Sequence, residues 1–490
     1  MEEDNTPVPK FGLRKSFMLG PEGSILDEEP LLGVGRVKTN FVLTTIMLCQ
    51  VPRLSAKLPS AGVPNLEIKS NTSGQPTYYN RLTGDTECII DEHVRDERKA
   101  PVAKAFLRAG PRAKLHFDPV KVNAAVVTCG TLCPGLNSVI HHLRDTLTTI
   151  YGAQKVYGVR GGWGGFHNPH TPVIELHDDA LDVSGRESLQ HRAGSILGCA
   201  AGGFDLYKIM DFIKRKEISQ LYVIGGDGAQ RGAHRIAVEC AALNWNVSIA
   251  GIPKSVNNDI DIIDRSFGFM TAVEAAQNAI RCATIEAKCN VPNGIGIVKL
   301  MGRSTGYLAA YATMASGDVD LCLVPEVPVV LEGKNGCLPH LERVVKKQGY
   351  AVVVVSDGAG QPALSEAAAE ARAAGQPAPS IGPFLKCEIE AYFKRKCRPV
   401  TVKYIDPSVA VRSVAANAFD QILCLQLAQN AVHGVMAGYT AFCAGVCNNR
   451  TCMIPMTEIT ENSPKSLNPH GRTWERVLCI TGQPGTHETY

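Results

Sequence analysis

Residues 220–232 read QLYVIGGDGAQRG, and the organisation of the whole chain can be worked out from this stretch. A short apolar run of β-branched and aromatic residues ends in two glycines, and a segment with helical spacing follows. Such a run is typical of a strand buried on both faces of a parallel sheet, in which a helix carries the chain back to the next strand. The stretch therefore predicts one strand–loop–helix unit of an α/β protein.

The same unit recurs on both sides of this stretch. Strands are predicted in the segments NAAVVTC, KVYGVR, VSIAGIP, GIGIVKLMG, LCLVPEV, YAVVVVSDGAG, VTVKYID and YTAFCAGV. Helices are predicted over residues 205–217, 271–289 and 419–438, where apolar residues recur at intervals of three and four. This alternation predicts two doubly wound parallel-sheet lobes, whose ligands lie beyond the carboxyl ends of the strands.

The composition is that of a soluble globular protein. The chain has 490 residues, of which 45% are hydrophobic and 20% charged, and its formal net charge is +3. This length is too great for one core, and the near-neutral charge favours neither a nucleic acid nor a membrane as partner. The absence of a long apolar run and the acidic start MEEDNTPVPK favour the cytoplasm and leave a plastid open as an alternative.

Two features are predicted to be structural. The 17 cysteines are scattered, which favours reduced thiols in the core. A zinc site at one of the C-x3-C pairs, residues 129 and 133 or 443 and 447, is the alternative. The Ala-rich segment LSEAAAEARAAGQPAPS (364–380) is of low complexity, and we interpret it as an exposed insertion.

Four loops rich in glycine or charge follow predicted strands, where parallel sheets place their ligands. They span residues 127–138, 224–232, 251–264 and 298–306. In the second loop Asp227 stands between glycines, so that a carboxylate can hold a hydrated Mg²⁺ while bare backbone approaches a nucleotide. A plain turn is the alternative for this loop and for the glycines of the first.

The third loop, GIPKSVNNDIDIID, places a lysine beside hydroxyl, amide and carboxylate groups, at Lys254, Ser255, Asn258 and Asp259. Such a cluster is typical of a metal and phosphate site, although the same side chains also serve in turns. The fourth loop carries Arg303, whose guanidinium suits a phosphate or a sugar hydroxyl if it is not simply a surface ion pair. Together the loops point to phosphoryl transfer, and the absence of GxxxxGK[ST] excludes a P-loop enzyme.

Six ordered motifs identify a resemblance to a known family. They are GGDG at 225–228, PKSVNND at 253–259, SFGF-x-TAVE-x-AQ at 266–277, KLMGR at 299–303, PE at 325–326 and VKYIDPS at 402–408. In this order and spacing the chain resembles 6-phosphofructokinase of glycolysis from about residue 108 to 475. It is most similar to the ATP-using group of plants and trypanosomatids, which is related to the pyrophosphate-dependent enzymes.

The resemblance implies a division of the chain. Residues 1–115 are expected to form an N-terminal extension or arm outside the core. Residues 116–268 are expected to form the nucleotide-side lobe, and residues 269–405 the sugar-phosphate-side lobe. Residues 406–490 then return to the first lobe and end in a tail.

The resemblance also implies the ligands and the residues that bind them. The family uses Mg²⁺ and ATP, and the positions of Asp227 and Asp259 serve the metal. The expected nucleotide-binding positions are Gly130, Thr131, Ala201, Gly225, Gly226, Asp227, Gly228 and Ala229. The expected fructose 6-phosphate positions are Ser255, Met301, Gly302, Arg303, Glu326, Lys403 and Arg412. The family assembles as tetramers, which implies a homo- or hetero-oligomer with other phosphofructokinase chains.

One departure from the family pattern concerns catalysis directly. The family motif P-K-T-I-D-N-D has its general base at the first aspartate, and this chain has Asn257 there. The catalytic positions implied by the motif are thus Lys254, Ser255, Asp259 and a degenerate base position at Asn257. An amide can hydrogen-bond a sugar hydroxyl but cannot accept its proton at neutral pH.

Four further departures surround the expected ligands. Thr131 replaces a glycine where a phosphate is expected to approach the backbone, Ala201 replaces an arginine, and Ala229 replaces a hydroxyl residue. Val409 stands where the sugar site usually has a tyrosine. The changes at Thr131, Ala201 and Ala229 predict weakened ATP binding.

The departures predict a chain with impaired or abolished catalysis, which acts as a regulatory or sugar-phosphate-sensing subunit beside active relatives. The first alternative is an active ATP-dependent enzyme in which Asp259, Asp261 or a water molecule relays the proton, or in which Asn257 is a sequencing error. The second is a phosphofructokinase-fold protein that uses another phosphoryl donor.

Overall fold

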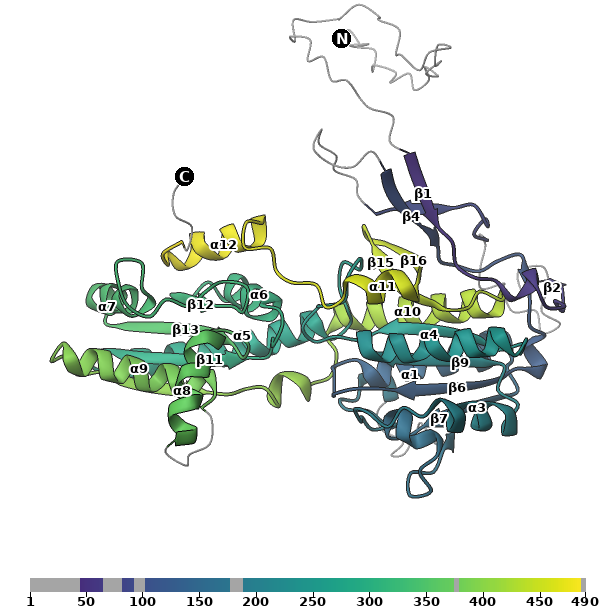
Figure 1. Cartoon of the computed structure of the whole chain (residues 1–490), viewed down its shortest axis with the longest axis horizontal. Helices are drawn as coiled ribbons and strands as arrows, with labels where there is room; N and C mark the ends of the chain where they lie inside the picture. Colours follow the sequence, from purple (N-terminus) through teal and green to yellow (C-terminus); the bar gives the residue numbers. More distant parts are fainter. Residues whose placement is uncertain (1–44, 65–81, 92–101, 177–187, 374–378, 486–490) are drawn as a thin grey trace, which may run out of the picture. The chain divides into compact units, whose positions relative to one another are not determined.

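Two β-sheets, each covered by helices on both faces, organise the chain (Figure 1). This computed structural model describes residues 45–64, 82–91, 102–176, 188–373 and 379–485. The larger sheet has the strand order β1-β4-β16-β15-β10-β9-β6-β7-β8 with β3 beside β4, and the smaller has the order β12-β13-β11-β14. The prediction of two doubly wound lobes is confirmed.

The centre of the larger sheet consists of parallel strands that are buried on both faces. They are β6 (Asn123–Thr128), β7 (Lys155–Val159), β9 (Gln220–Gly225), β10 (Ser248–Pro253) and β15 (Phe442–Cys447). Leu221 and Val223 of β9 belong to the apolar cluster that includes α3 (Leu206–Arg215) and α4 (Asp227–Ala242). Tyr222 and Ile224 belong to the cluster on the other face, with α1 (Leu136–Asp145) and α10 (Ala418–Met436). Alternation along the strand thus explains why the run is apolar throughout.

Antiparallel strands extend this sheet at both edges. They include β16 (Arg450–Pro455), β4 (Val102–Arg108), β3 (Cys88–Ile90) and β8 (Ile174–Glu175), while β1 (Thr45–Cys49) runs parallel to β4. A separate two-stranded ribbon joins β2 (Val63–Pro64) to β5 (Lys114–Leu115).

Strand β4 corrects one expectation from the sequence. Residues before 115 were expected to lie outside the core, but Leu107 pairs with Met453 of β16, and Phe106 is fully buried. The run is hard to recognise in the sequence because Lys104 and Arg108 interrupt it, and both reach carboxylates instead of burying their charge. Residues 1–44 of the expected arm lie outside the described residues.

The smaller sheet is entirely parallel. Its strands are β11 (Gly294–Leu300), β12 (Leu321–Leu323), β13 (Tyr350–Ser356) and β14 (Thr401–Ile405). Apolar residues of α5 (Phe269–Cys289) and α6 (Tyr307–Ser316) cover one face, and those of α7 (Cys337–Gln348) and α9 (Ile381–Arg395) cover the other. The helices predicted at 205–217, 271–289 and 419–438 correspond to α3, α5 and α10, and are confirmed.

The Ala-rich segment, interpreted as an exposed insertion, forms a helix that is largely exposed. Helix α8 spans Gln361–Ala373, and Leu364 is buried against the smaller sheet. Alanine has the highest helix propensity of all residues, so a run that looks merely repetitive in composition is a good helix former. Residues 374–378 of this segment lie outside the described residues.

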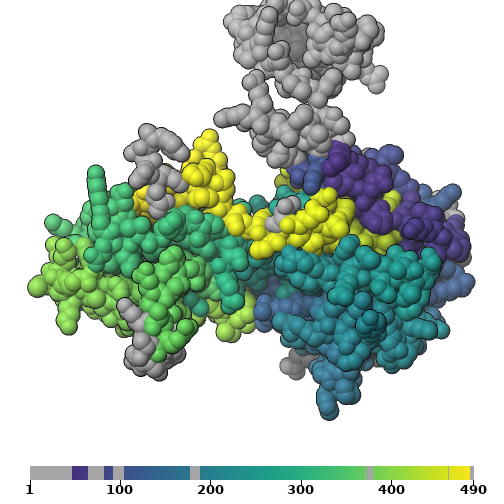
Figure 2. All heavy atoms as spheres, viewed as in Figure 1, coloured from purple at the N-terminus to yellow at the C-terminus, as the bar shows by residue number. Residues whose placement is uncertain are grey.

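Two helices close the described part of the chain, α11 (Met456–Asn462) and α12 (Arg472–Thr481). Figure 2 shows this last part of the chain, in yellow, on the face in view. Short 3₁₀ turns occur at Leu54–Ala56, Pro119–Lys121, Gly162–Phe166, Leu189–His191 and Ala410–Arg412, and a π turn at Thr146–Tyr151. In the described ranges no helix has the length and apolarity that a membrane span needs.

Candidate active site

Most of the expected nucleotide-binding residues line one cavity at the carboxyl ends of β6 and β9. Its volume is about 570 Å³, within the usual range for a small-molecule site. The expected residues that line it are Gly130, Ala201, Gly226, Asp227, Gly228 and Ala229. Trp163, Phe204 and Arg235 also line it, and the motifs did not single out any of these three.

The loop after β6 brings two distant segments together. Gly130 has a φ of +87°, a conformation that favours glycine, and its N–H donates to the carbonyl of Ala200 at 2.8 Å. This contact places Ala201, 71 residues later in the chain, on the same cavity wall. Thr131 is exposed and is not part of the lining, so the crowding expected from its side chain stays a prediction.

Asp227 is the first residue of α4, and Gly226 is the N-cap. The Asp227 carboxylate lies 3.0 Å from the guanidinium of Arg231, one turn later, and 38% of the Asp227 side chain is exposed. A Cβ at Gly228 would meet no atom within 4 Å, so the neighbouring backbone is open to a ligand. An accessible carboxylate beside open backbone at a helix N-terminus is able to bind a cation together with phosphate groups.

The loop after β10 lies directly beside the loop after β6. The Lys254 side chain is buried, with 6% exposed, and its Nζ donates to the Thr131 carbonyl at 2.6 Å. The Lys254 backbone N–H donates to Gly225 at 3.0 Å, which anchors this loop to β9 as well. The ammonium therefore lies at the junction of three of the loops that the sequence singled out.

Two side chains and one backbone N–H of this loop form a compact hydrogen-bonded group. Ser255 Oγ donates to Asp259 Oδ1 at 2.5 Å, and the Asn257 backbone N–H donates to Ser255 Oγ at 3.1 Å. The side-chain Oδ1 of Asn257 is buried and has no hydrogen-bond partner in the described part of the chain. Such an orphaned acceptor is costly, and it marks a position where a donor from a ligand would be favourable.

Asn258 has a structural role. It adopts a φ of +54°, its Nδ2 donates to Asp264 at 3.2 Å, and its Oδ1 accepts the Ser266 N–H at 2.8 Å. Its side chain is thus fully used in shaping the loop, as asparagine does in tight turns. The interpretation of Asn258 as a ligand-binding group is not supported, whereas Ser255 and Asp259 lie together as expected.

On the smaller sheet, the loops after β11 and β12 meet. Gly302 has a φ of +138°, and a Cβ there would collide with the Thr305 carbonyl oxygen. The Glu326 carboxylate accepts the Gly306 N–H at 3.0 Å, which joins the PE motif to the end of the KLMGR loop. Met301 is half-buried and Arg303 exposed, so the guanidinium is available to a ligand.

Lys403 and Arg412 do not lie beside this loop junction in the same way. Lys403 of β14 pairs in register with Gly296 of β11, which precedes Met301 by five residues. At a rise of about 3.3 Å per residue, this is roughly 16 Å along the strand. The ammonium of Lys403 lies 3.5 Å from the Glu286 carboxylate. Arg412 Nε donates to the Ser408 carbonyl at 2.8 Å. The sugar-binding roles of both residues stay predictions.

The segment of residues 463–467 contacts several of the site loops, and none of the sequence motifs pointed to it. The Lys465 N–H donates to the Asp259 carbonyl at 2.8 Å, and its Nζ donates to the Ile263 carbonyl at 2.8 Å. The Leu467 N–H donates to Glu326 at 2.7 Å. Because SPKSLNP reads as an ordinary loop, no local pattern marks it as part of the site.

Burial shifts the pKa values of one lysine and two cysteines near these loops. Burial lowers the pKa of Lys465, while attraction to Asp261, Asp264 and Asp259 opposes this shift. Burial raises the pKa of Cys129 and of Cys133 to about 12, although the nearby Lys254 lowers both. These two thiols are therefore protonated at neutral pH, as expected for core cysteines, and all 17 cysteines are free.

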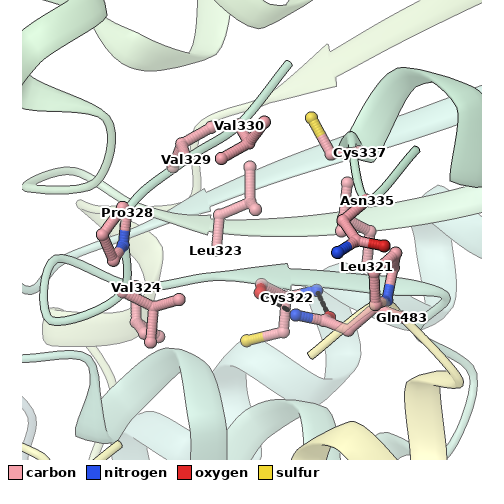
Figure 3. Close-up of a pocket in the computed structure, with 12 residues that line it drawn as sticks. Leu321, Cys322, Leu323, Val324, Pro328, Val329, Val330, Asn335, Cys337 and Gln483 are labelled. Atoms are coloured by element: carbon pink, nitrogen blue, oxygen red, sulfur yellow. Dashed lines mark hydrogen bonds between the residues drawn. The ribbon is translucent and has the colours of Figure 1, made fainter. Parts of the chain in front are cut away.

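A second pocket, shown in Figure 3, lies apart from these loops at the edge strand β12. The carboxamide of Gln483 accepts the Cys322 N–H at 2.7 Å and donates to its carbonyl at 3.0 Å, in place of a neighbouring strand. The space is about 30 Å³, which is room for a water molecule and not for a metabolite. Gln483 covers the open edge of β12. The pocket forms no part of the candidate site.

Comparison with known proteins agrees with the motifs. A family model described as Phosphofructokinase matches residues 123–456. The Arabidopsis thaliana protein named ATP-dependent 6-phosphofructokinase 7 is 43% identical over 398 residues, which cover 81% of this chain and 80% of that protein. The ATP-dependent 6-phosphofructokinase of Trypanosoma brucei brucei is 35% identical over 440 residues, which cover 88% and 87%.

A solved structure agrees with the fold. The pyrophosphate-dependent phosphofructokinase from Marinobacter aquaeolei aligns with a TM-score of 0.60 at 20% identity, over 75% of this chain and 93% of that chain. At this identity the likeness concerns the fold alone. The family match and the two relatives, in contrast, extend over most of the sequence. The resemblance to the plant and trypanosomatid group is confirmed, and the chain belongs to the phosphofructokinase family.

Proposed function

We propose that this chain binds ATP, Mg²⁺ and fructose 6-phosphate but transfers the phosphoryl group slowly or not at all, and that it acts as a regulatory subunit. The family's reaction converts ATP and fructose 6-phosphate into ADP and fructose 1,6-bisphosphate. The cavity after β6 and β9 supports nucleotide binding, and the loop junction on the smaller sheet supports sugar-phosphate binding. Ligand binding would thus be retained, whereas proton transfer from the sugar hydroxyl would be impaired.

The observation that carries this proposal is the state of Asn257. Its Oδ1 is buried without a hydrogen-bond partner in the described part of the chain, so it is an unused acceptor for a sugar hydroxyl once a local shift of the loop exposes it. It cannot take the proton, because a neutral amide is not a base at pH 7. Loss of a general base costs about 10² to 10⁴ in rate.

Ala201 adds a second deficit. This methyl group lines the cavity where the family pattern has an arginine. A missing charge-assisted contact costs about 1.5 to 3 kcal/mol, or roughly tenfold to a hundredfold if the contact acts in the transition state. Multiplied together, the two losses bring a kinase of ordinary rate, about 1 to 100 per second, close to inactivity.

The residues present fit a Mg²⁺ ion. The described residues hold no cluster of three or more His, Cys, Asp or Glu side chains around one point. Mg²⁺ in nucleotide sites is commonly held by one or two carboxylates together with phosphates and water, and Asp227 on the cavity wall would supply one such carboxylate, with Asp259 as the second position that the family motif implies. When bound, the ion would neutralise charge on the phosphates. Arg231, which lies 3.0 Å from Asp227, would then have to give up this contact.

One contact favours the alternative of an active enzyme. Asp259 lies two residues after Asn257 and already accepts a hydrogen bond from the Ser255 hydroxyl. A serine hydroxyl linked to a carboxylate is able to pass on a proton, so Ser255 and Asp259 form a possible relay. In this alternative Asn257 orients the sugar hydroxyl and the relay accepts its proton.

The deciding experiment measures ADP release by the purified chain with ATP, Mg²⁺ and fructose 6-phosphate, beside the variant Asn257→Asp. We expect a silent or very slow natural chain and a gain of about 10² or more in the variant. An ordinary rate in the natural chain would contradict the proposal, and Asp259→Asn would then test the relay. Binding of both substrates is measured in parallel by calorimetry, so that an inactive chain is distinguished from one that does not bind.

A regulatory subunit also needs partners. We propose that the chain assembles with phosphofructokinase chains, identical or related, and that a tetramer is the complete form. Mass photometry of the chain alone and mixed with an active relative tests this. A chain that stays monomeric in both conditions would contradict the regulatory role without touching the binding proposal.

A further inference from the structure

A second large cavity lies outside the candidate active site. Its volume is about 490 Å³, and its walls come from the ribbon β2/β5 and the turns before β3 and after β1. The side chains that matter below are Arg53, Ser60, Asp85, Arg112 and Lys114, and we call this cavity the basic pocket. It shares no lining residue with the nucleotide cavity, and these five residues all precede the segment that matches the family model.

The charges on its walls do not balance. Arg53, Arg112 and Lys114 each carry a positive charge, and Asp85 is the acidic residue of the lining. Asp85 is shared between two guanidiniums, at 3.1 Å from Arg53 and 3.2 Å from Arg112. Lys114 is exposed at the pocket wall, and no ion pair links it to a carboxylate among the described residues. The lining therefore has a net charge of about +2, which favours an anion.

The two guanidiniums are held in place before any ligand arrives. Arg112 is 2% exposed and donates to the Arg108 carbonyl at 2.7 Å, while Arg53 donates to the Ala437 carbonyl at 3.2 Å. Both lie against the ring of Tyr439, at 4.9 Å for Arg53 and 5.6 Å for Arg112. A fixed pair of planar, always-charged forks suits the oxygens of a phosphate and costs little ordering on binding.

Asp85 resembles a replaceable counter-ion more than a permanent partner. Its side chain is 55% exposed and sits in a turn, whereas the Arg112 guanidinium is buried. The Asp85 carboxylate also accepts a hydrogen bond from Tyr439 Oη at 3.2 Å, a contact that a phosphate oxygen would take over. The Ser60 hydroxyl, which lines the same cavity, adds a neutral polar group to the wall. A cavity of this size holds more than a bare anion, so an organic group attached to the phosphate has room as well.

We propose that the basic pocket is a second ligand site, which binds a small phosphate-bearing molecule away from the nucleotide cavity. The shared chemistry of the ligand is a phosphate dianion, whether free or as an ester of a small polar molecule. Lys114 and the exposed edge of Arg53 contact the phosphate, and Arg112 provides the buried positive charge beneath it. Asp85 opposes binding because it is a like charge at the same place.

Two substitutions with opposite expected effects test this proposal on the full chain. Lys114→Met removes an exposed positive charge and is expected to weaken phosphate binding about tenfold. Asp85→Asn removes the competing negative charge and is expected to tighten binding about threefold to tenfold. A residue with a purely structural role would not make binding tighter when it is removed. Isothermal titration calorimetry with inorganic phosphate and with ribose 5-phosphate gives the affinities.

Two matched variants separate the alternatives. Lys121→Met removes an exposed lysine, 80% exposed, that does not line the pocket, and it should leave binding unchanged. Arg235→Met removes an exposed arginine of the nucleotide cavity and should also leave binding unchanged. If Arg235→Met weakens binding and Lys114→Met does not, the phosphate is in the nucleotide cavity and the proposal is wrong.

The remaining outcomes are equally decisive. Absence of saturable binding of both probes at millimolar concentration would overturn the proposal, as would unchanged affinity in both Lys114→Met and Asp85→Asn. Tighter binding of ribose 5-phosphate than of inorganic phosphate supports an ester as the ligand. The reverse order supports the free anion. Should Asp85→Asn fail to fold, Lys114→Glu replaces it, with a greater loss of affinity expected than for Lys114→Met.

Discussion

At the scale of single residues, Asn257 and Ala201 each remove one functional group from an otherwise intact loop. The amide of Asn257 retains the shape of an aspartate, and its Oδ1 remains buried without a partner in the described part of the chain. Ala201 occupies an exposed position on the cavity wall, so a longer side chain there has space in front of it. Because each difference from the family pattern concerns one side chain, a single substitution is expected to restore each group.

The variant Ala201→Arg is expected to bind ATP about tenfold or more tightly than the natural chain, because a guanidinium then faces the phosphates beside Asp227. Displacement of a fluorescent nucleotide measures the change. The matched control is Tyr207→Arg, which adds the same charge at an 86% exposed position of α3 outside the cavity. Equal gains in both variants would mean that net charge, and not the cavity wall, is responsible.

At the scale of elements, the segment of residues 463–467 connects the site loops through backbone contacts. Ser463 Oγ accepts the Asp261 N–H at 2.9 Å, and Arg231 donates to the Ser463 carbonyl at 3.1 Å. Two residues later, the ammonium of Lys465 donates a hydrogen bond to the Ile263 carbonyl at 2.8 Å. The loop of residues 255–264 has many backbone N–H and C=O groups that need hydrogen-bond partners, and the segment of residues 463–467 provides several of them.

Lys465→Met keeps the length of the side chain but removes its ammonium, so the Ile263 carbonyl loses a donor. We expect amide hydrogen exchange in residues 255–264 to become about tenfold faster, because a hydrogen bond to a charged group contributes about 1.5 kcal/mol to local stability. Exchange followed by mass spectrometry measures this. Lys208→Met, which removes an exposed partner of Asp205 on α3, is the control. Unchanged exchange in the loop would show that the segment does not hold it.

At the scale of the whole molecule, one apolar cluster contains buried residues of α1 and α10 from the larger sheet and of α5 and α6 from the smaller sheet. Helices α5 and α10 also share a buried polar contact, in which the Thr271 N–H donates to Asp420 at 2.8 Å. Thr271 belongs to the TAVE part of a family motif. Thr271 of that motif therefore serves the packing of two helices.

The acid stability of the molecule should depend on His433 in α10. Burial, assisted by the charge of Arg112, lowers the pKa of His433 to about 3 from its ordinary 6.5. The unfolded chain therefore binds one more proton than the folded chain between about pH 6.5 and 3. Stability contributed by the neutral histidine is complete above pH 6.5 and is lost as the pH falls through this window, by about 1.4 kcal/mol per pH unit.

We expect His433→Gln to lose less stability than the natural chain between pH 7 and pH 5, although it starts lower because the 2.7 Å hydrogen bond between Tyr151 Oη and His433 Nδ1 is lost. Urea midpoints at the two pH values give the comparison. His470→Gln, at an exposed position, should behave like the natural chain. If the pH dependence of His433→Gln equals that of the natural chain, another group governs acid unfolding.

Much of the fold was predictable because its signals are local. An apolar run such as LYVI predicts a doubly buried strand, and its spacing from the next helix predicts a crossover. Strand β4 and helix α8 were missed for the opposite reason. Leu107 of β4 pairs with Met453, more than 340 residues later in the chain, and the Ala-rich run was judged by its repetitiveness and not by its helix propensity.

The sequence by itself determined the family, the order of the loops and the asparagine at position 257, because covalent order and residue chemistry are present in the chain before it folds. Only the tertiary structure decided that Ala200 bonds to Gly130 and so brings Ala201 to the cavity wall, that Lys465 supports the Asp259 loop and that Arg53, Arg112 and Lys114 share one pocket. Each of these contacts joins residues far apart in sequence, and no local pattern records which distant backbone will satisfy a polar group. Packing of the two sheets makes that choice.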